Sequence, residues 1–312
     1  MKTPICSNCK RDEAFFFRPY SGEKLCKRCF VISIKDKVKA TIAEFNMLEY
    51  DDRIAVAVSG GKDSLSLLQI LANIEQNYPK TSIIAISVDE GIKGYRDKAL
   101  KIASENCKKL RIEHQIISFK KAYGLTQDEI IHNIQKKERA NELTPCAYCG
   151  VLRRKLINIK AREVEADKVA MAHTLDDEVQ TILLNILHGD PLRIAREKPI
   201  TDLTHPELIQ RIKPFCKIPE KETALYAYTR RLIFQDRPCP YSSKAMRNDT
   251  RVFLNRMEQK HAGIKFSIFR SMQRIRPALE MITEEIELKE CSECGEQTTQ
   301  STCRACQLLQ QM

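Results

Sequence analysis

Eight of the thirteen cysteines stand in two sets of four, one near each end of the 312-residue chain. The first set consists of two CxxC pairs separated by 16 residues, and the second of two CxxC pairs separated by eight residues. Four thiolates at such spacing can surround one tetrahedral Zn²⁺, which supplies folding free energy that a short segment cannot gain from apolar burial. We therefore predict two zinc sites, with the ligands Cys6, Cys9, Cys26 and Cys29 in the first and Cys291, Cys294, Cys303 and Cys306 in the second.

The five remaining cysteines include a further CxxC pair, Cys146 and Cys149, and Cys239 in a Cys-Pro-Tyr segment. A CxxC pair at the start of a helix lowers the pKa of its thiols, and this favours thiolates that bind metal or attack electrophiles. A redox dithiol and a third zinc site without its fourth ligand are the alternatives. Cys107 and Cys216 are interpreted as ordinary residues. We call Cys146, Cys149 and Cys239 the central cysteines.

The charge of the chain indicates a polyanionic partner. Its 52 Lys and Arg against 41 Asp and Glu give a formal charge of +11, and basic residues gather at 153–155, 230–231 and 247–256. Aromatic residues make up 6% of the chain, which favours a folded RNA over a long unstructured strand. No apolar run approaches the roughly 18 residues of a membrane span, and residues 1–30 show no secretory signal. We expect a cytoplasmic protein with no membrane partner.

Between the two cysteine sets, short β-branched runs alternate with helical patterns. Strands are predicted at 53–59, 82–89, 114–119, 168–173 and 208–213, and helices at 65–74, 95–110, 126–139 and from about 150, 175 and 220. Near-continuously apolar strands in such alternation predict an α/β fold with a doubly wound parallel sheet, Rossmann-like and covered on both faces. We divide the chain into an N-terminal zinc finger (1–32), a catalytic domain (33–286) and a C-terminal zinc finger (287–312).

The first strand runs into the sequence SGGKDS, which comprises Ser59, Gly60, Gly61, Lys62, Asp63 and Ser64. Two glycines let the backbone turn tightly and aim N–H groups at an anion, and the following helix adds its dipole. The sequence lacks the GxxxxGK[ST] pattern of a Walker loop. It matches the pyrophosphate loop of the N-type ATP pyrophosphatases, which cleave ATP between the α- and β-phosphates. We therefore expect ATP at the switch point of the sheet.

Two adjacent carboxylates, Asp176 and Asp177, follow the strand predicted at 168–173. Carboxylates beside a phosphate site suit Mg²⁺ held partly through water and substrate oxygens. The alternative is that one of them caps the following helix. Because the two side chains point in different directions on a helix, one can cap while the other acts.

The order of these motifs resembles the TtuA/NcsA family of tRNA 2-thiouridine synthetases, which is related to TtcA. The resemblance extends over about residues 3–308 and rests on the terminal cysteine sets, SGGKDS, CxxCGxxRR, HxLDD and CPY. It implies an N-type ATP pyrophosphatase domain between two zinc fingers, and a [4Fe–4S] cluster held by the central cysteines. By the same mapping, nucleotide contacts fall on Ala57, Val58, Ser59, Asp63, Arg153, the backbone near Ile86 and the segment near Ala172. Relatives often carry Lys at position 153.

The resemblance implies that ATP adenylates the C2 oxygen of a uridine and that a sulfur nucleophile then expels AMP. The loop amides, Lys62, Arg153 and Mg²⁺ near Asp63, Asp176 or Asp177 would stabilise charge on the phosphates. One iron of a cluster with three protein ligands is free to bind the sulfide. In the alternative chemistry, without a cluster, a CxxC cysteine carries a persulfide.

The target uridine and the sulfur donor stay open. The family contains enzymes for position 34 and for position 54, and the Lys-rich insert at 120–142 favours position 34 and an archaeal, NcsA-like enzyme. Free sulfide and a ubiquitin-like thiocarboxylate carrier are both possible donors, and the resemblance implies a homodimer. Two other classes of function compete. An amide- or lysidine-forming pyrophosphatase would leave the central cysteines idle, and a non-catalytic zinc-finger RNA-binding protein would not need SGGKDS.

Overall fold

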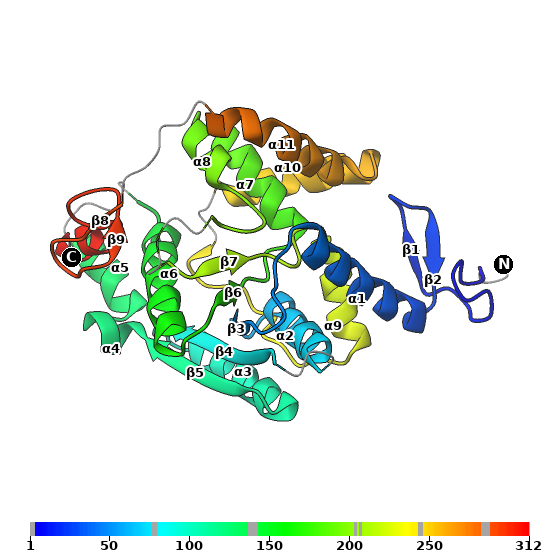
Figure 1. Cartoon of the computed structure of the whole chain (residues 1–312), viewed down its shortest axis with the longest axis horizontal. Coiled ribbons are helices and arrows are strands. Elements are labelled where there is room, and N and C mark those ends of the chain that lie inside the picture. The colour runs from blue at the N-terminus through cyan, green and yellow to red at the C-terminus, as the bar shows by residue number, and fades with distance from the viewer. Residues whose placement is uncertain are drawn as a thin grey trace.

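The computed structural model describes residues 4–76, 80–136, 143–202, 205, 208–242, 246–281 and 288–311, and a parallel β-sheet forms its centre (Figure 1). In these residues the sheet has five strands in the order β5-β4-β3-β6-β7, and every neighbouring pair is parallel. The predicted doubly wound sheet is thus confirmed. Its strands are β3 (Arg53–Ala57), β4 (Ser82–Asp89), β5 (Glu113–Ser118), β6 (Lys168–Ala170) and β7 (Gln210–Ile212).

Helices cover both faces of the sheet because the central strands are apolar on both sides. In β3, Ile54 and Val56 pack into one cluster of buried side chains, whereas Ala55 packs into the other. The helices are α2 (Lys62–Glu75), α3 (Arg96–Leu110), α4 (Phe119–Tyr123), α5 (Gln127–Lys136), α6 (Pro145–Glu163), α7 (Leu175–Leu187), α8 (Pro191–Arg196), α9 (Glu220–Thr229), α10 (Arg247–Lys260) and α11 (Ile264–Met281).

The order of the strands places two motifs side by side. From β3 the chain moves to β4 and β5 on one side of the sheet, and later to β6 and β7 on the other. The loops after β3 and β6 therefore meet where the strand order reverses, which is where doubly wound sheets bind ligands. The loop after β3 carries SGGKDS, and the loop after β6 leads to Asp176 and Asp177.

Several element boundaries differ from the sequence prediction. Helix α6 begins at Pro145 instead of about residue 150, because Thr144 is extended and the fixed φ of proline suits the first turn of a helix. Strand β6 ends at Ala170, the Met171 amide still donates to the Ile212 carbonyl at 2.8 Å, and residues 172–174 lead on to α7. Of the helix predicted at 126–139, α5 accounts for the part up to Lys136; residues 137–142 of the Lys-rich insert lie outside the described residues.

The two terminal modules lie at opposite ends of the molecule (Figure 1). The first contains a hairpin of β1 (Phe16–Arg18) and β2 (Glu23–Leu25), and α1 (Lys27–Glu44) runs from it into the central body. This continuous helix crosses residue 32, the predicted domain boundary. The second contains β8 (Lys289–Glu290), β9 (Gln297–Thr298) and α12 (Arg304–Gln310), and it packs against α6. The three-part division of the chain stays a prediction.

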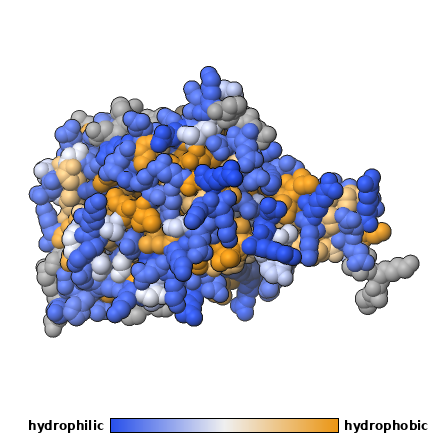
Figure 2. All heavy atoms as spheres, turned by 90° about the horizontal axis from the view of Figure 1, so that it is seen from below, coloured by the Kyte–Doolittle hydropathy of each residue, from blue (hydrophilic) through white to orange (hydrophobic). Residues whose placement is uncertain are grey.

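The surface in Figure 2 is mainly hydrophilic, with apolar side chains in small groups between the polar ones. No helix within the described ranges is both long enough and apolar enough to cross a bilayer.

Candidate active site and metal centres

The SGGKDS loop is held in a shape that only glycine permits at its second position. Gly60 has a φ of +87°, and a Cβ there would lie 2.3 Å from the carbonyl oxygen of Ala99. The Ser64 hydroxyl donates to the Gly61 carbonyl at 3.0 Å and accepts from the Ser59 amide at 3.1 Å. Gly61 is the N-cap of α2 and offers no side chain to its amides. This arrangement fits a bound phosphate.

Lys62 and Asp63 enter a polar network at the start of α9. The Lys62 ammonium lies 2.8 Å from an Asp63 carboxylate oxygen and 2.8 Å from Glu220 Oε1. The buried Thr223 hydroxyl donates to the second Asp63 oxygen. Burial raises the pKa of Asp63 and outweighs the opposing effect of Lys62. The sequence analysis did not single out Glu220 or Thr223, whose only signal is their place in the first turn of a helix after Pro219.

The two carboxylates of the HxLDD motif have different surroundings. Asp177 forms a capping box with Thr174, since its side chain accepts from the Thr174 amide at 2.9 Å. Asp176 is 5% exposed; it accepts from the Glu220 amide at 2.7 Å and from the Lys265 ammonium. Glu220 therefore joins the two motifs, with its carboxylate on Lys62 and its amide on Asp176. Asp177 takes the capping role expected for one of the pair, and Mg²⁺ binding by either stays a prediction.

The other predicted nucleotide positions lie near the carboxyl edge of neighbouring strands. Ala57 pairs in register with Ile86, and the Ile86 carbonyl accepts from the Val58 amide at 2.8 Å. Ala172, half-buried, follows the adjacent strand β6. The fold thus gathers these positions around the SGGKDS loop, although the Ile86 carbonyl is already used within the sheet. Their contacts with ATP stay predictions.

The fold brings together the central cysteines, which are up to 93 positions apart in the numbering, 239 − 146. Cys146 and Cys149 occupy the first turn of α6, and the Cys146 thiol lies 3.6 Å from the carbonyl oxygen of Tyr241, two residues after Cys239. Cys146 and Cys239 both act electrostatically on Cys149. Burial raises the pKa of Cys149 to about 12 and also raises that of Cys239. Desolvation thus outweighs the helix terminus at Cys149, and metal binding by the central cysteines stays a prediction.

Two buried charges connect the SGGKDS loop to the central cysteines. The Arg96 guanidinium donates to the Ser59 carbonyl at 2.7 Å and lies 2.8 Å from Glu90 Oε2. The other oxygen of Glu90 lies 3.5 Å from Arg153, one helical turn beyond Cys149. Arg96 and Glu90 are only 5% and 4% exposed. Neither residue is predicted from the sequence patterns.

A second connection runs through the backbone. The Gln235 amide donates to the Gly60 carbonyl at 2.9 Å, and Gln235 lies four residues before Cys239. The segment that carries Cys239 is therefore anchored to the SGGKDS loop. Near Arg153, the surrounding protein and the cation Lys213 lower the pKa of His173, although the residue is exposed at the surface.

Each terminal cysteine set has the geometry of a zinc site. All four sulfur atoms of each set lie within 4.8 Å of one another. The Cys9–Cys26 and Cys294–Cys303 sulfurs are 3.9 and 3.8 Å apart. A tetrahedron with Zn–S bonds of about 2.3 Å has edges of about 3.8 Å, so these residues fit Zn²⁺.

The central cysteines form a more open group. Among the described residues they are not one of the sets whose ligand atoms lie within 4.8 Å of one another. Cys146 is exposed, and Cys149 and Cys239 are half-buried. A four-iron cluster is larger than a single ion, so its ligands stand farther apart. Three neighbouring thiols, one of them exposed, with Arg153 beside them, fit such a cluster as a donor set.

The fold and the loop define a PP-loop protein, in which a strand, a glycine-containing loop and a helix form an ATP-binding unit. Residues 33–258 match the model of the PP-loop domain family. The chain is 34% identical to the tRNA 2-thiolation protein NcsA of Haloferax volcanii, over 98% of both chains. It is 35% identical to a probable sulfurtransferase of Methanocaldococcus jannaschii, over 90% of this chain and 80% of that protein.

The comparison with solved structures agrees with these relatives. The U34-tRNA thiolase NcsA from Methanococcus maripaludis, solved with its [4Fe-4S] cluster, is similar with a TM-score of 0.85 and 34% identity, over 100% of this chain and 97% of that one. The chain therefore belongs to the TtuA/NcsA family of tRNA 2-thiouridine synthetases.

Proposed function

We propose that this protein is a tRNA-uridine 2-sulfurtransferase that uses ATP to convert the wobble uridine, position 34, to 2-thiouridine. The observation that carries the proposal is the connection of the SGGKDS loop to the central cysteines through Arg96, Glu90 and Arg153. Activation of an oxygen and delivery of sulfur must occur at the same carbon atom, so the two sites have to share one framework. The similar U34-tRNA thiolase supports position 34 over position 54.

The uridine C2 oxygen is a poor leaving group, and adenylation by ATP converts it into a better one. The C2 oxygen attacks the α-phosphorus, the bond to the β-phosphate oxygen breaks, and pyrophosphate leaves. The first-turn amides of α2 bind the phosphates, and Lys62 is near enough to offset their charge. Glu220 and Thr223 position Lys62 and Asp63 for this task, and Asp63 with Asp176 or Asp177 is the proposed Mg²⁺ site.

In the second half of the reaction a sulfur nucleophile forms a bond to C2, and the C2–O bond breaks as AMP leaves with the oxygen. Cys146, Cys149 and Cys239 would hold a [4Fe–4S] cluster, which supplies a site for the incoming sulfide when bound. Arg153 lies beside these thiols and favours negative charge there. A persulfide on Cys146 or Cys149, formed without a cluster, is the alternative chemistry.

The proposal includes two structural Zn²⁺ ions at the terminal sets, a homodimer, and sulfide or a ubiquitin-like carrier as sulfur donor. A cytoplasmic location is supported by relatives named cytoplasmic tRNA 2-thiolation protein 1, such as that of Chlamydomonas reinhardtii, which is 34% identical over 88% of this chain and 75% of its own length.

The test is an anaerobic reaction of iron-loaded protein with ATP, Mg²⁺, sulfide and unmodified tRNA, followed by nuclease mapping and mass spectrometry. We expect one sulfur-bearing uridine in the anticodon fragment and one AMP per sulfur inserted. Sulfur in the T-loop fragment would assign position 54. AMP release without thiolation would point to another acceptor, such as an amide- or lysidine-forming reaction. No AMP release would leave a non-catalytic RNA-binding protein, and full activity without iron would overturn the cluster.

A further inference from the structure

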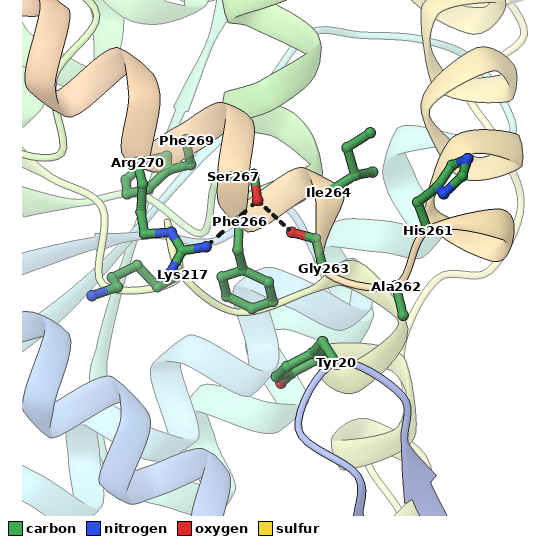
Figure 3. Close-up of a pocket in the computed structure, with 10 residues that line it drawn as sticks. All are labelled: Tyr20, Lys217, His261, Ala262, Gly263, Ile264, Phe266, Ser267, Phe269 and Arg270. Atoms are coloured by element: carbon green, nitrogen blue, oxygen red, sulfur yellow. Dashed lines mark hydrogen bonds between the residues drawn. The ribbon is translucent and has the colours of Figure 1, made fainter.

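A pocket of about 600 Å³ lies where the N-terminal module meets the start of α11 (Figure 3). Tyr20, from the turn between β1 and β2, forms one wall, and Lys217 comes from the segment between β7 and α9. The rest of the wall comes from the residue after α10 to the first turns of α11, and comprises His261, Ala262, Gly263, Ile264, Phe266, Ser267, Phe269 and Arg270. The volume lies within the range of small-ligand sites, and none of the candidate active-site residues lines it.

The polar side chains around this pocket favour an anion. Lys217, His261 and Arg270 line it, and no carboxylate does so among the described residues. The Lys217 ammonium lies 2.5 Å from the Glu44 carboxylate, which offsets part of the lysine charge. Arg270 is exposed and, in the part of the chain that the structure describes, its guanidinium has no carboxylate partner; it contacts the Ser267 hydroxyl at 3.5 Å. Arg270 is thus the side chain most open to a phosphate.

Two aromatic rings, those of Tyr20 and Phe266, form one side of the pocket. The Phe266 ring projects toward Tyr20, and the ring centroids are 4.6 Å apart with an interplanar angle of 53° (Figure 3). Tyr20 is fixed, because its hydroxyl bonds to Glu222 and Lys37 and the Lys37 ammonium lies 4.7 Å from its ring centroid. A supported aromatic surface beside a cation suits a base stacked on a ring with its phosphate at the cation.

We propose that this pocket binds one unstacked nucleotide of the tRNA, distinct from the uridine that reacts, with its base on Phe266 and its phosphate at Arg270. The inference rests on the proposed function for the identity of the RNA. The chemistry shown, aromatic plus cationic, recognises a nucleotide whether free or within RNA. The RNA source is favoured by the +11 charge of the chain and because the SGGKDS loop already provides a site for ATP.

The charge contact is tested with a matched pair of variants on α11. Arg270 lines the pocket, whereas Arg274 is equally exposed one turn further along and does not. In tRNA-binding titrations at several salt concentrations, Arg270→Gln should weaken binding severalfold and reduce the slope of log K against log salt by about 1. Arg274→Gln should change binding by less than about twofold and leave the slope unchanged. Equal effects of the two variants would overturn the proposal.

The stacking contact is tested with Phe266→Leu, which keeps apolar volume and removes the aromatic face. Base–aromatic stacking contributes about 1–3 kcal/mol, so tRNA affinity should fall by about fivefold or more, with the salt slope unchanged. Unchanged affinity would contradict the assignment. Thermal unfolding and zinc content, equal to those of the unsubstituted protein, show that the variant is folded.

Two further measurements separate the source of the nucleotide from the identity of the reaction. Titration with AMP distinguishes a free ligand: if Arg270→Gln removes one AMP site, leaves the site at the SGGKDS loop and keeps tRNA affinity intact, the RNA assignment is wrong. Thiolation by Arg270→Gln at saturating tRNA should retain kcat and show a raised KM for tRNA. If neither the unsubstituted protein nor its variants thiolate tRNA, the proposed function is wrong. If the variants still differ in tRNA affinity as expected, the assignment of the pocket remains supported.

Discussion

The terminal cysteine sets and the central cysteines differ in how closely their thiols are grouped and in how exposed they are. Each terminal set comes from a segment of 24 residues or fewer, 29 − 6 + 1 and 306 − 291 + 1, and closes around a small volume with sulfurs within 4.8 Å of one another. The central cysteines come from two distant segments, and Cys146 is exposed. A closed, four-coordinate set leaves no place for a substrate, whereas an open set of three does.

Their neighbours differ as well. The first terminal set packs into the core with α1, and Lys155 lies 2.9 Å from Cys294 of the second set, so their contacts hold modules in place. The central cysteines instead neighbour Arg153 and Glu90, which lead to the SGGKDS loop. Because the first contacts hold modules in place while the second lead to the SGGKDS loop, we expect substitutions in the two kinds of site to fail in different measurements.

The largest effect should follow loss of a terminal ligand. Zinc contributes roughly 10–16 kcal/mol in isolated fingers, so Cys29→Ser should release one zinc per chain and open the N-terminal module. Metal analysis and hydrogen exchange would show zinc falling from two to one and protection lost from β1 and β2, with iron retained. Cys306→Ser is the matched control at the other end. If either variant lost iron before zinc, the division between the two kinds of site would fail.

The next largest effect should follow loss of the buried ion pair that anchors the N-terminal module. Arg18 is 1% exposed and donates to both carboxylate oxygens of Glu222, at 3.1 and 2.8 Å. Arg18→Met leaves that buried carboxylate without its main partner, a change that typically costs about 3–5 kcal/mol; since Lys37 remains 3.5 Å away, we expect about 3 kcal/mol. Denaturant unfolding measures the loss. The double variant Arg18→Met/Glu222→Leu should recover part of it, and no recovery would mean that the ion pair is not the cause.

Loss of a central cysteine should act on activity. Replacing partners of a metal ligand lowers affinity or activity by about 10–100-fold, so Cys149→Ser, which removes a ligand itself, should reduce thiolation by more than about 100-fold. Iron and acid-labile sulfide should fall while both zinc ions and the unfolding temperature are retained. Cys107→Ser, at a buried cysteine outside the site, is the control. Full thiolation activity in Cys149→Ser would show that Cys149 is not needed for delivery of sulfur.

A smaller effect is expected at the connection between the sites. One carboxylate oxygen of Glu90 lies beside Arg96 and the other lies beside Arg153. The side chain of glutamine has only one oxygen that can accept, so it can keep only one of these two contacts. Glu90→Gln should therefore lower kcat for thiolation by about 10-fold, the lower end for an outer partner, with little change in zinc or tRNA affinity. Glu129→Gln changes an exposed carboxylate elsewhere and serves as control. Equal kcat in the two variants would show that Glu90 does not position the site.

The strands, the terminal cysteine sets and the SGGKDS turn were predictable because they depend on local sequence patterns. The apolar runs identified the five strands, since a sheet covered on both faces needs apolar residues at successive positions. The spacing of the cysteines identified both terminal sets for the same reason: their ligands are close in the chain. The motif SGGKDS identified the turn, because Gly60 with φ +87° has no room for a side chain.

The connections within the site were not predictable, because they join residues far apart in the chain. Glu220 and Lys62 are 158 positions apart, and Arg153 and Glu90 are 63 apart, 153 − 90. A charged residue in a helix has the same local signature whether it faces solvent or a buried partner. The sign of the pKa shift at Cys149 was likewise decided by burial, which depends on what packs over the thiol.

The sequence by itself determined the sheet, the terminal cysteine sets and the family, because all three depend on short-range patterns of residue type. Only the tertiary structure decided that Arg96 and Glu90 join the SGGKDS loop to the central cysteines, that Glu220 joins Lys62 to Asp176, and that Tyr20 meets Phe266 in a pocket. The physical reason is that hydrogen bonds and stacking act over a few ångströms, and only the folded chain brings such distant residues within that range.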